Sequence, residues 1–479
     1  MTYIYDKGVN DAPFWPALCS PHPVIKPLHM RQQRQAILCF LIFLSVTSLV
    51  KAQTGATDTA LQNLPSKWNL QNCLDFAIRN NITINTFRLS QRSSEQDLLQ
   101  ARAANQPNLL GTASEGLTYQ KRPNGTGGYG NRTVTGSGNY GVNSAVTLYQ
   151  GGYIRNNAKE KQLLTETAGL DILQQENDLT LSVTQGFLNI LLAKENIIYL
   201  QDLVNTSGEQ VKQARQKYDA GSIALKDLVQ LQAQYANDKY SLVTAQNTHR
   251  QYIISLKQFL QLPSSVDFDL QEPDTLITKE LVPNLTEVQQ QALAIRPEIK
   301  IADKNLDIAR VNLQLARSAY NPTLSASGAS ATSHSGGDPS ILKQLDNNFY
   351  QQIGLSLSVP IFTRRVARTG VEKAKIQIEQ AQLDQKNTRN NLSLTVEQAY
   401  VNVINAQGQY DASVEQLTAT KESYRIAGEQ LKVGAIATVD YLIQKNLYTQ
   451  SYQQYVQAKY NAALTIRIYD FYRGVPIKF

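Results

Sequence analysis

Two stretches of the chain alternate between apolar and polar residues with a period of two, as strands with one apolar face do. In residues 133–149 the even positions are mostly apolar and the odd positions mostly polar, and residues 349–361 repeat this alternation. A less regular partner segment precedes each stretch, and a long polar connection rich in turn-forming residues joins the two. The pattern therefore predicts one β-hairpin at about 108–149 and a second at about 323–362.

Each predicted hairpin leads into a helical pattern that is far longer than an average helix. The segment from 153 to 217 contains no proline, and at ~1.5 Å per residue it would span roughly 100 Å. A turn at Gly221 and a second helix follow, so the long helices cover about 153–262. The second half repeats this arrangement over about 364–472. The apolar stripe of the first long helix consists of Val183, Phe187, Ile190, Ile197 and Val204.

These correspondences extend over the chain and indicate a duplication. Residues in the first part match residues 215 positions later, and beyond the hairpins the spacing becomes 213. A period of this length is too long for an ordinary solenoid unit. We therefore divide the chain into a first repeat, 53–283, and a second repeat, 284–479. Each consists of a helix, a hairpin and a pair of long antiparallel helices.

The helix that opens each repeat has recognisable start and stop signals. Asn284, with Glu287 three residues later, resembles a capping box, and Asn69 occupies the equivalent position in the first repeat. Both helices are expected to stop before a proline, at Pro107 and Pro322. A further proline, at position 297, is expected to break the second of these helices near its start.

The first 52 residues have the pattern of a targeting signal. A short basic stretch begins at Met30, and an apolar run of 15 residues from Ala36 to Val50 precedes small residues suited to signal-peptidase cleavage. The run is shorter than a transmembrane helix requires, although a membrane anchor is the alternative interpretation. Residues 30–52 are thus expected to be a signal peptide, and 1–29 an upstream extension or a misassigned start.

Composition excludes several classes of protein. The chain contains three Cys without a Cys-x-x-Cys pair and four scattered His, which argues against disulfide-stapled, zinc and haem proteins. Removing residues 1–52 lowers the formal charge from +7 to +4, and no basic run is interleaved with aromatic residues. We therefore expect no cofactor, no metal and no nucleic-acid partner. We do not expect the chain to be an enzyme. No Gly-x-x-x-x-Gly-Lys-Ser/Thr phosphate loop is present, so energy for any work it does would have to come from a partner.

The four predicted strands cannot form a stable membrane structure by themselves. In lipid only a closed barrel pairs every backbone group, and a sheet of four strands leaves two edges open. Several copies of the chain would therefore share one barrel. Three copies would supply twelve strands, an even number within the usual range of such barrels.

With these features in order, the chain resembles the TolC family of outer-membrane efflux proteins over about residues 66–473. The resemblance rests on the duplication, on the segment Tyr149–Tyr153 that leads into a long helix, and on two turns. The turns read KYDAGSIALKDL at 217–228 and KVGAIATVDYL at 432–442. The resemblance implies an α+β membrane protein, a homotrimer whose twelve-stranded β-barrel in the outer-membrane lipid continues into a periplasmic α-helical barrel. Such a protein is a passive, gated exit duct for a tripartite efflux pump or for type I secretion.

The resemblance also implies partners and the surface that meets them. A periplasmic adaptor and an inner-membrane pump would dock at the two tip turns. Carboxylates near the start of a helix favour its N-terminus, so Asp227 and Asp440 are expected to cap the helices that follow the turns. The residues of the turns themselves are Ala220, Gly221, Ser222, Val433, Gly434 and Ala435.

One departure from the family concerns the gate. Some members close the tunnel with a ring of aspartates on the second-half long helix, but residues 412–433 contain no Asp. A gate or cation filter formed by the charged residues of this segment is one interpretation, and a solvated helix face is the other. The residues concerned are Glu415, Glu422, Arg425 and Glu429.

A second departure is the pair Arg364–Arg365, which replaces Gly151–Gly152 of the first repeat. Its place directly after an apolar strand suggests the inner-leaflet interface or the tunnel mouth, with an ordinary solvated pair as the alternative.

Two rival functions remain. A periplasmic adaptor also contains long helical hairpins, but it would need a sandwich-type β domain and would not show this duplication. A structural coiled-coil protein without a channel would not need the alternating strands.

Overall fold

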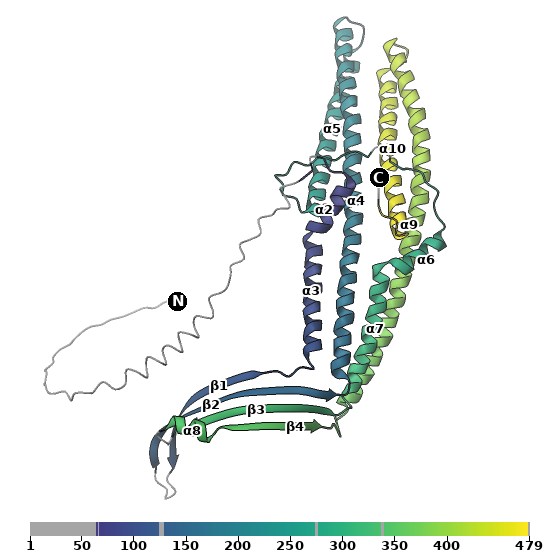
Figure 1. Cartoon of the computed structure of the whole chain (residues 1–479). Coiled ribbons are helices and arrows are strands. Elements are labelled where there is room, and N and C mark those ends of the chain that lie inside the picture. The colour runs from purple at the N-terminus through teal and green to yellow at the C-terminus, as the bar shows by residue number, and fades with distance from the viewer. Residues whose placement is uncertain (1–63, 66, 124–128, 274–275, 337–339, 478–479) are drawn as a thin grey trace, which may run out of the picture. The chain divides into compact units, whose positions relative to one another are not determined.

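The computed structural model describes residues 64–65, 67–123, 129–273, 276–336 and 340–477. Both halves of the chain run from two helices through two strands to two long helices, and the second half has one additional short helix between its strands (Figure 1). The expected extension at 1–29 and the expected signal peptide at 30–52 lie outside the described residues. None of the described helices is both long and apolar enough to cross a membrane.

The opening helix is broken in both repeats, whereas the sequence predicted a break only in the second. The first repeat begins with α2 (Leu70–Asn80) and α3 (Ile82–Ala103), and the second with α6 (Leu285–Ile295) and α7 (Pro297–Ser318). At the first break Asn81 has extended backbone angles and replaces the missing proline. Its N–H donates to the last turn of α2 (2.8 Å), and its side chain accepts from the Ile84 N–H (3.2 Å).

The caps of the opening helices differ in one respect from the prediction. The Asn69 side chain accepts from the backbone N–H of Asn72 at 2.7 Å, as a capping residue does. Asn284 accepts from the Thr286 N–H at 2.9 Å, but Glu287 instead accepts from the Gln291 side chain. The capping box is therefore not closed, and a single side chain caps α6.

The two β-hairpins form one antiparallel sheet with the strand order β1-β2-β3-β4. Its strands are β1 (Leu110–Pro123), β2 (Tyr129–Gln150), β3 (Thr323–Ser335) and β4 (Tyr350–Ser358). The β2–β3 pairing joins the repeats. Its register places Val146 opposite Ala326, which lies opposite Leu355. Because facing residues point to the same side of a sheet, the apolar faces of both hairpins merge into one.

The connection between β3 and β4, predicted as a polar loop, contains a short helix, α8 (Ile341–Asn347). The Ser340 side chain caps it by accepting from the Lys343 N–H. The Asn348 side chain donates to the Ser333 carbonyl at 2.7 Å, which holds the helix against β3. Local side-chain contacts of this kind leave no periodic signal in a seven-residue segment.

Four long helices continue from the sheet. They are α4 (Tyr153–Asp219) and α5 (Leu225–Leu260) in the first repeat, and α9 (Val366–Lys432) and α10 (Thr438–Tyr472) in the second. Each repeat thus forms one helical hairpin, α4 beside α5 and α9 beside α10 (Figure 1). Helix α5 ends two residues before the expected Leu262, because Gln261 adopts a left-handed conformation with φ 56°.

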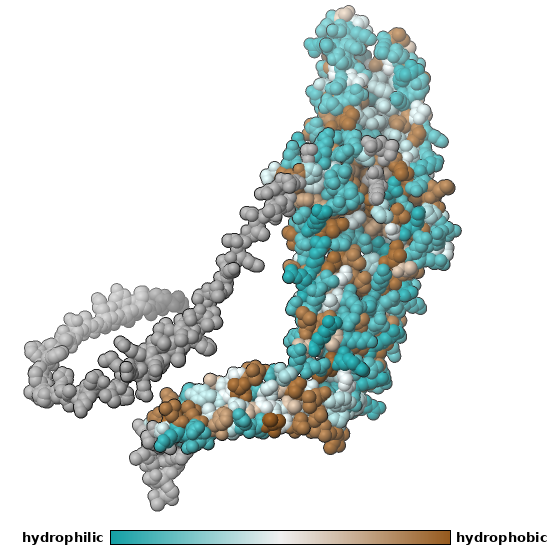
Figure 2. Space-filling view, in the orientation of Figure 1, coloured by the Kyte–Doolittle hydropathy of each residue, from teal (hydrophilic) through white to brown (hydrophobic). Residues whose placement is uncertain are grey.

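The apolar residues of the long helices lie along narrow seams. Hydrophilic residues cover most of the visible face of these helices (Figure 2). Val183, Phe187 and Ile190 of the predicted stripe are almost completely buried. A separate core joins α6 to the helical hairpin of α9 and α10 through Val288, Val396 and other residues. Beside this core the Tyr469 hydroxyl donates to the Pro283 carbonyl.

The break at Asn81 provides a test of local stability. Replacing Asn81 with Ala removes the cap of α3, which is expected to lower the free energy of unfolding by about 1–2 kcal/mol. The matched control is Ser93→Ala, an exposed position inside the same helix. Thermal unfolding of the purified protein, followed by circular dichroism, should show a lower midpoint for Asn81→Ala alone. Equal midpoints for the two variants would contradict the capping role.

Candidate functional site

The turn that joins α4 to α5 and the turn that joins α9 to α10 have the same backbone geometry. In the first, the Gly221 N–H donates to the Tyr218 carbonyl and the Ser222 N–H to the Lys217 carbonyl, both at 2.8 Å. These two bonds form a Schellman motif, which requires a residue with positive φ, and Gly221 has φ 72°. A Cβ on Gly221 would meet nothing within 4 Å. Backbone conformation, and not crowding, therefore requires glycine.

The second turn repeats this bonding at the equivalent positions. The Gly434 N–H donates to the Leu431 carbonyl (3.2 Å) and the Ala435 N–H to the Gln430 carbonyl (2.8 Å), with φ 73° at Gly434. All six residues predicted for the turns are exposed. Val433 is the large apolar one among them, and 80% of its surface is exposed. The two turns thus present the same backbone shape with different side chains.

Asp227 and Asp440 lie near the turns, but neither is the capping residue that the sequence predicted. The N-cap positions of α5 and α10 are Ala224 and Ala437, and neither makes a side-chain cap bond. Each aspartate lies in the first turn of its helix. There its charge interacts favourably with the helix dipole without replacing a missing backbone bond.

The charged residues considered for a gate lie exposed along α9, and most of them are paired on their own helix. Arg425 donates twice to Glu422, at 2.7 and 2.8 Å, and Lys432 donates to Glu429 at 2.8 Å. These hydrogen bonds lower the pKa of both carboxyl groups below their ordinary value and raise that of the Arg425 guanidinium. Glu415 makes no ion pair with any residue that the structure describes.

A cavity of about 330 Å³ lies between the two helical hairpins, near their turns. Arg425 and Glu429 line it from the second repeat, and Gln210 and Lys217 from the first. Of the predicted gate residues, these two therefore face the space between the repeats. Glu415 and Glu422 do not line it.

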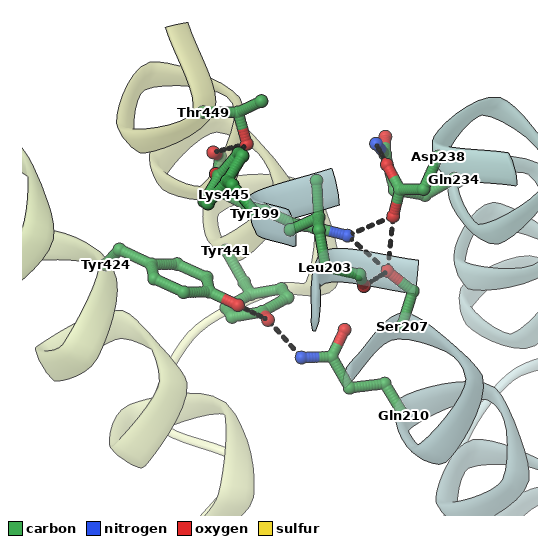
Figure 3. Close-up of polar contacts among 10 residues, drawn as sticks. All are labelled: Tyr199, Leu203, Ser207, Gln210, Gln234, Asp238, Tyr424, Tyr441, Lys445 and Thr449. Carbon is green, nitrogen blue, oxygen red and sulfur yellow. Dashed lines mark hydrogen bonds and ion pairs between the residues drawn. The ribbon is translucent and has the colours of Figure 1, made fainter. Parts of the chain in front are cut away.

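Farther from the turns, a buried polar cluster connects α4, α5 and α10 (Figure 3). The Lys445 ammonium is fully buried and lies 2.6 Å from Asp238 Oδ2 and 2.7 Å from Ser207 Oγ. Ser207 also donates to Asp238, and the Gln234 side chain donates to the other carboxylate oxygen at 2.8 Å. Burial lowers the pKa of the Lys445 ammonium, and the Asp238 carboxylate opposes that shift.

Tyrosines make a second set of contacts between the hairpins. The Tyr441 hydroxyl accepts from Gln210 of α4 and lies 3.0 Å from the Tyr424 hydroxyl (Figure 3). Tyr199 of α4 stacks on Tyr452 with a centroid distance of 3.9 Å. Burial raises the pKa of Tyr441 above its ordinary value and that of Tyr452 to about 12, so these phenols remain neutral near pH 7.

The duplication explains why the sequence did not reveal the buried pair. At the spacing of 213 residues, Ser207 and Asp238 correspond to Thr420 and Ser451, whose hydroxyls also bond each other across their hairpin. Lys445 corresponds to Gln232. Each charge therefore occurs in only one repeat. The sequence signal that could have revealed this pair is a charged residue in one repeat at a position where the other repeat has a neutral polar residue.

Among the described residues, no group of three or more His, Cys, Asp or Glu side chains is placed to hold a metal ion. The one described cysteine, Cys73, is buried in α2, and burial raises the pKa of its thiol to about 12.

Comparison with known proteins gives a consistent result. The family described as "Outer membrane efflux protein" matches residues 74–260 and 288–466, which together are more than half of the chain. The outer membrane protein TolC of Escherichia coli (strain K12) is 23% identical over 351 residues, covering 69% of each chain. The outer membrane efflux protein BepC of Brucella suis biovar 1 is 22% identical over 435 residues, covering 89% of this chain and 90% of BepC.

Among solved structures, the transmembrane channel protein CusC shares the fold. It has a TM-score of 0.73 at 17% identity and covers 87% of this chain and 96% of its own. This likeness confirms the predicted fold class, and the comparisons do not favour either rival function. The chain belongs to the outer membrane efflux protein family, a family of transport channels of the outer membrane.

Proposed function

We propose that three copies of this chain form a gated exit duct through which cargo crosses the periplasm and the outer membrane. The observation that supports this proposal best is the sheet. One of its faces is mostly apolar, apart from the paired side chains of Glu115 and His334, and β1 and β4 lie at its open edges. Pairing β1 of one copy with β4 of the next closes a barrel of twelve strands, which satisfies every backbone group in lipid.

The long helices supply the periplasmic part of the duct. Helices α4 and α9 each contain 67 residues, a length of ~100 Å at 1.5 Å per residue. In the trimer, twelve long helices would enclose a tunnel below the barrel. The division into repeats at 53–283 and 284–479 belongs to this proposal, since each contributes one strand pair and one long hairpin.

An adaptor and an inner-membrane pump complete the assembly at the tip turns. The relatives called proteases secretion protein PrtF and alkaline protease secretion protein AprF carry secretion in their names. TolC and BepC are named as outer membrane proteins, BepC with efflux. For this chain we propose a role that agrees with these names, an exit duct for efflux or for type I secretion. The chain itself would catalyse no reaction, so the pump supplies the energy.

Gating would be a shift between two arrangements of the hairpins. The contacts of Lys445 with Asp238 and of Tyr441 with Gln210 hold the second hairpin to the first. An adaptor that binds the turns more tightly when the hairpins are apart would shift the population toward the open duct. The charged face of α9 would then select ions at the entrance.

The docking role of the turns can be tested with Gly434→Pro. Proline fixes φ near −65° and lacks the N–H that Gly434 donates to the Leu431 carbonyl. The turn should change shape, and export of a fluorescent dye from cells that depend on this duct should be lost, while cross-linking still shows trimers. The matched control is Gly408→Ala, a helical position with open space around the added Cβ. Normal export by Gly434→Pro would contradict docking at this turn.

The gate assignment predicts a difference among three glutamates. Glu422 and Glu429 have basic partners on α9, whereas Glu415 has no ion pair among the described residues. Glu415→Gln should therefore lower cation selectivity more than Glu422→Gln, since the charge of Glu422 is already balanced by Arg425. Reversal potentials of single channels in a planar bilayer measure this selectivity. An equal or smaller effect of Glu415→Gln than of Glu422→Gln would contradict this prediction, and no effect would place Glu415 outside the conducting path.

The buried pair predicts separate effects on stability and on opening. Lys445→Met leaves the Asp238 carboxylate buried without its ammonium, which should destabilise the protein by about 3–5 kcal/mol. Adding Asp238→Leu should restore stability, because both charges are then absent. Both variants lose the ion pair between the helical hairpins and keep the tyrosine contacts, so both should conduct more at rest than wild type.

A matched control for this link is Arg88→Met, which removes an ion pair to Glu176 within the first repeat. It should leave the resting conductance unchanged. If the stable double variant also conducts like wild type, the pair maintains stability and takes no part in closing the duct.

A further inference from the structure

The segment between β4 and α9 exposes large apolar side chains next to arginines. Ile361 is 94% exposed and Phe362 is 83% exposed, and Val359 and Val366 beside them are also exposed. Exposed residues of this size in a row are unusual in water and indicate a surface with a partner. The segment, residues 359–366, is called the junction segment below.

The register of the sheet fixes where the junction segment begins. Gln150 at the end of β2 pairs with Thr323 of β3, which pairs with Ser358 at the end of β4. The junction segment therefore leaves the sheet at the same end as Gly151–Gly152 of the first repeat. This is the end from which the long helices continue.

The backbone at this point is one that glycine adopts most readily. Gly151 and Gly152 have φ 58° and 82°, and Arg364 and Arg365 have φ 46° and 67° at the equivalent positions. Gly151 is also required by space, because a Cβ there would lie 2.4 Å from the Asn321 side chain. The second repeat thus places two arginines where the left-handed backbone favours glycine.

The charges of these arginines are not balanced within the described structure. Arg364 and Arg365 are exposed, as is Arg368 in the first turn of α9. None of the three forms an ion pair with a residue that the structure describes. Three guanidinium groups therefore stand beside the apolar side chains, each with donors in a planar fork that matches a phosphate.

Aromatic residues surround the same end of the sheet. Tyr149, Tyr153 and Tyr320 are exposed there, in addition to Phe362. Figure 2 shows hydrophobic residues gathered where the sheet meets the helices. Exposed aromatic residues at one level, with basic residues just beyond them, are typical of the boundary between lipid tails and head groups.

We infer that the junction segment binds the phosphate head group of an anionic phospholipid in the inner leaflet of the outer membrane. Ile361 and Phe362 insert among the acyl chains, and Arg364, Arg365 and Arg368 contact the phosphate. This inference rests on the proposed function in one respect, namely that the sheet lies in the membrane. A lipid fits better than a soluble anion because the cations adjoin exposed apolar side chains that water solvates poorly.

The test uses the purified full-length protein in vesicles of phosphatidylcholine with a minor share of phosphatidylglycerol. Electron paramagnetic resonance of spin-labelled lipids measures the preference of the protein for phosphatidylglycerol over phosphatidylcholine. At low salt each arginine should contribute about fivefold to this preference. Arg364→Gly with Arg365→Gly restores the glycine pair of the first repeat and, by removing two arginines, should reduce the preference about 25-fold. Arg364→Lys with Arg365→Lys should retain most of it.

The matched control is Lys386→Gln with Lys421→Gln, which removes two exposed charges from α9 away from the junction segment. If the glycine pair impairs folding, Arg368→Gln provides the same test within a regular helix. Inorganic phosphate at matched ionic strength should not displace the labelled lipid, and displacement would assign the arginines to a free anion and overturn the inference. An unchanged preference in the glycine variant would also overturn it. Failure of wild type to insert into vesicles would count against the proposed function instead.

Discussion

The need to pair every backbone group in lipid is the constraint on which the proposed assembly depends. The sheet has an apolar face on four strands, and its two outer strands each have an unpaired edge. Water could solvate those edges, but hydrocarbon cannot. Closure by further copies removes the edges and places the helices of each copy around one axis. In that assembly the long helices enclose the tunnel and their exposed turns meet the partners, which they cannot do in a single chain.

Polar contacts hold the two hairpins of one chain together, in contrast to an ordinary helical bundle. The seams between α4, α5 and α10 contain a buried lysine, an aspartate and several tyrosines, in addition to leucine and alanine. A buried ion pair contributes little net stability compared with apolar packing, but it is sensitive to the position of its partners. Such contacts define one arrangement of the hairpins without making separation prohibitively costly. This balance suits a duct that has to open.

Sequence periodicity predicted the parts of the fold that depend on local pattern. The hairpins, the long helices and the glycine turns follow from alternation, helical spacing and the demand for positive φ at Gly221 and Gly434. The break at Asn81 was missed because asparagine can end one helix and cap the next without a proline signal. Helix α8 was missed because it depends on contacts with β3. At the candidate site, the spacing of Glu422 and Arg425 on one helix already allows their pairing, whereas the pair Lys445–Asp238 depends on how α10 packs against α5, which the pattern of residues does not specify.

The equal geometry of the two turns has a consequence for stoichiometry. In the proposed trimer the tunnel would end in six turns with one backbone shape but two alternating surfaces, one with Ser222 and one with the exposed Val433. A partner that recognises the backbone shape would find six equivalent places. A partner that needs the valine would find three. The duplication therefore allows the same tunnel end to accept a ring of three or of six subunits, depending on which feature the partner recognises.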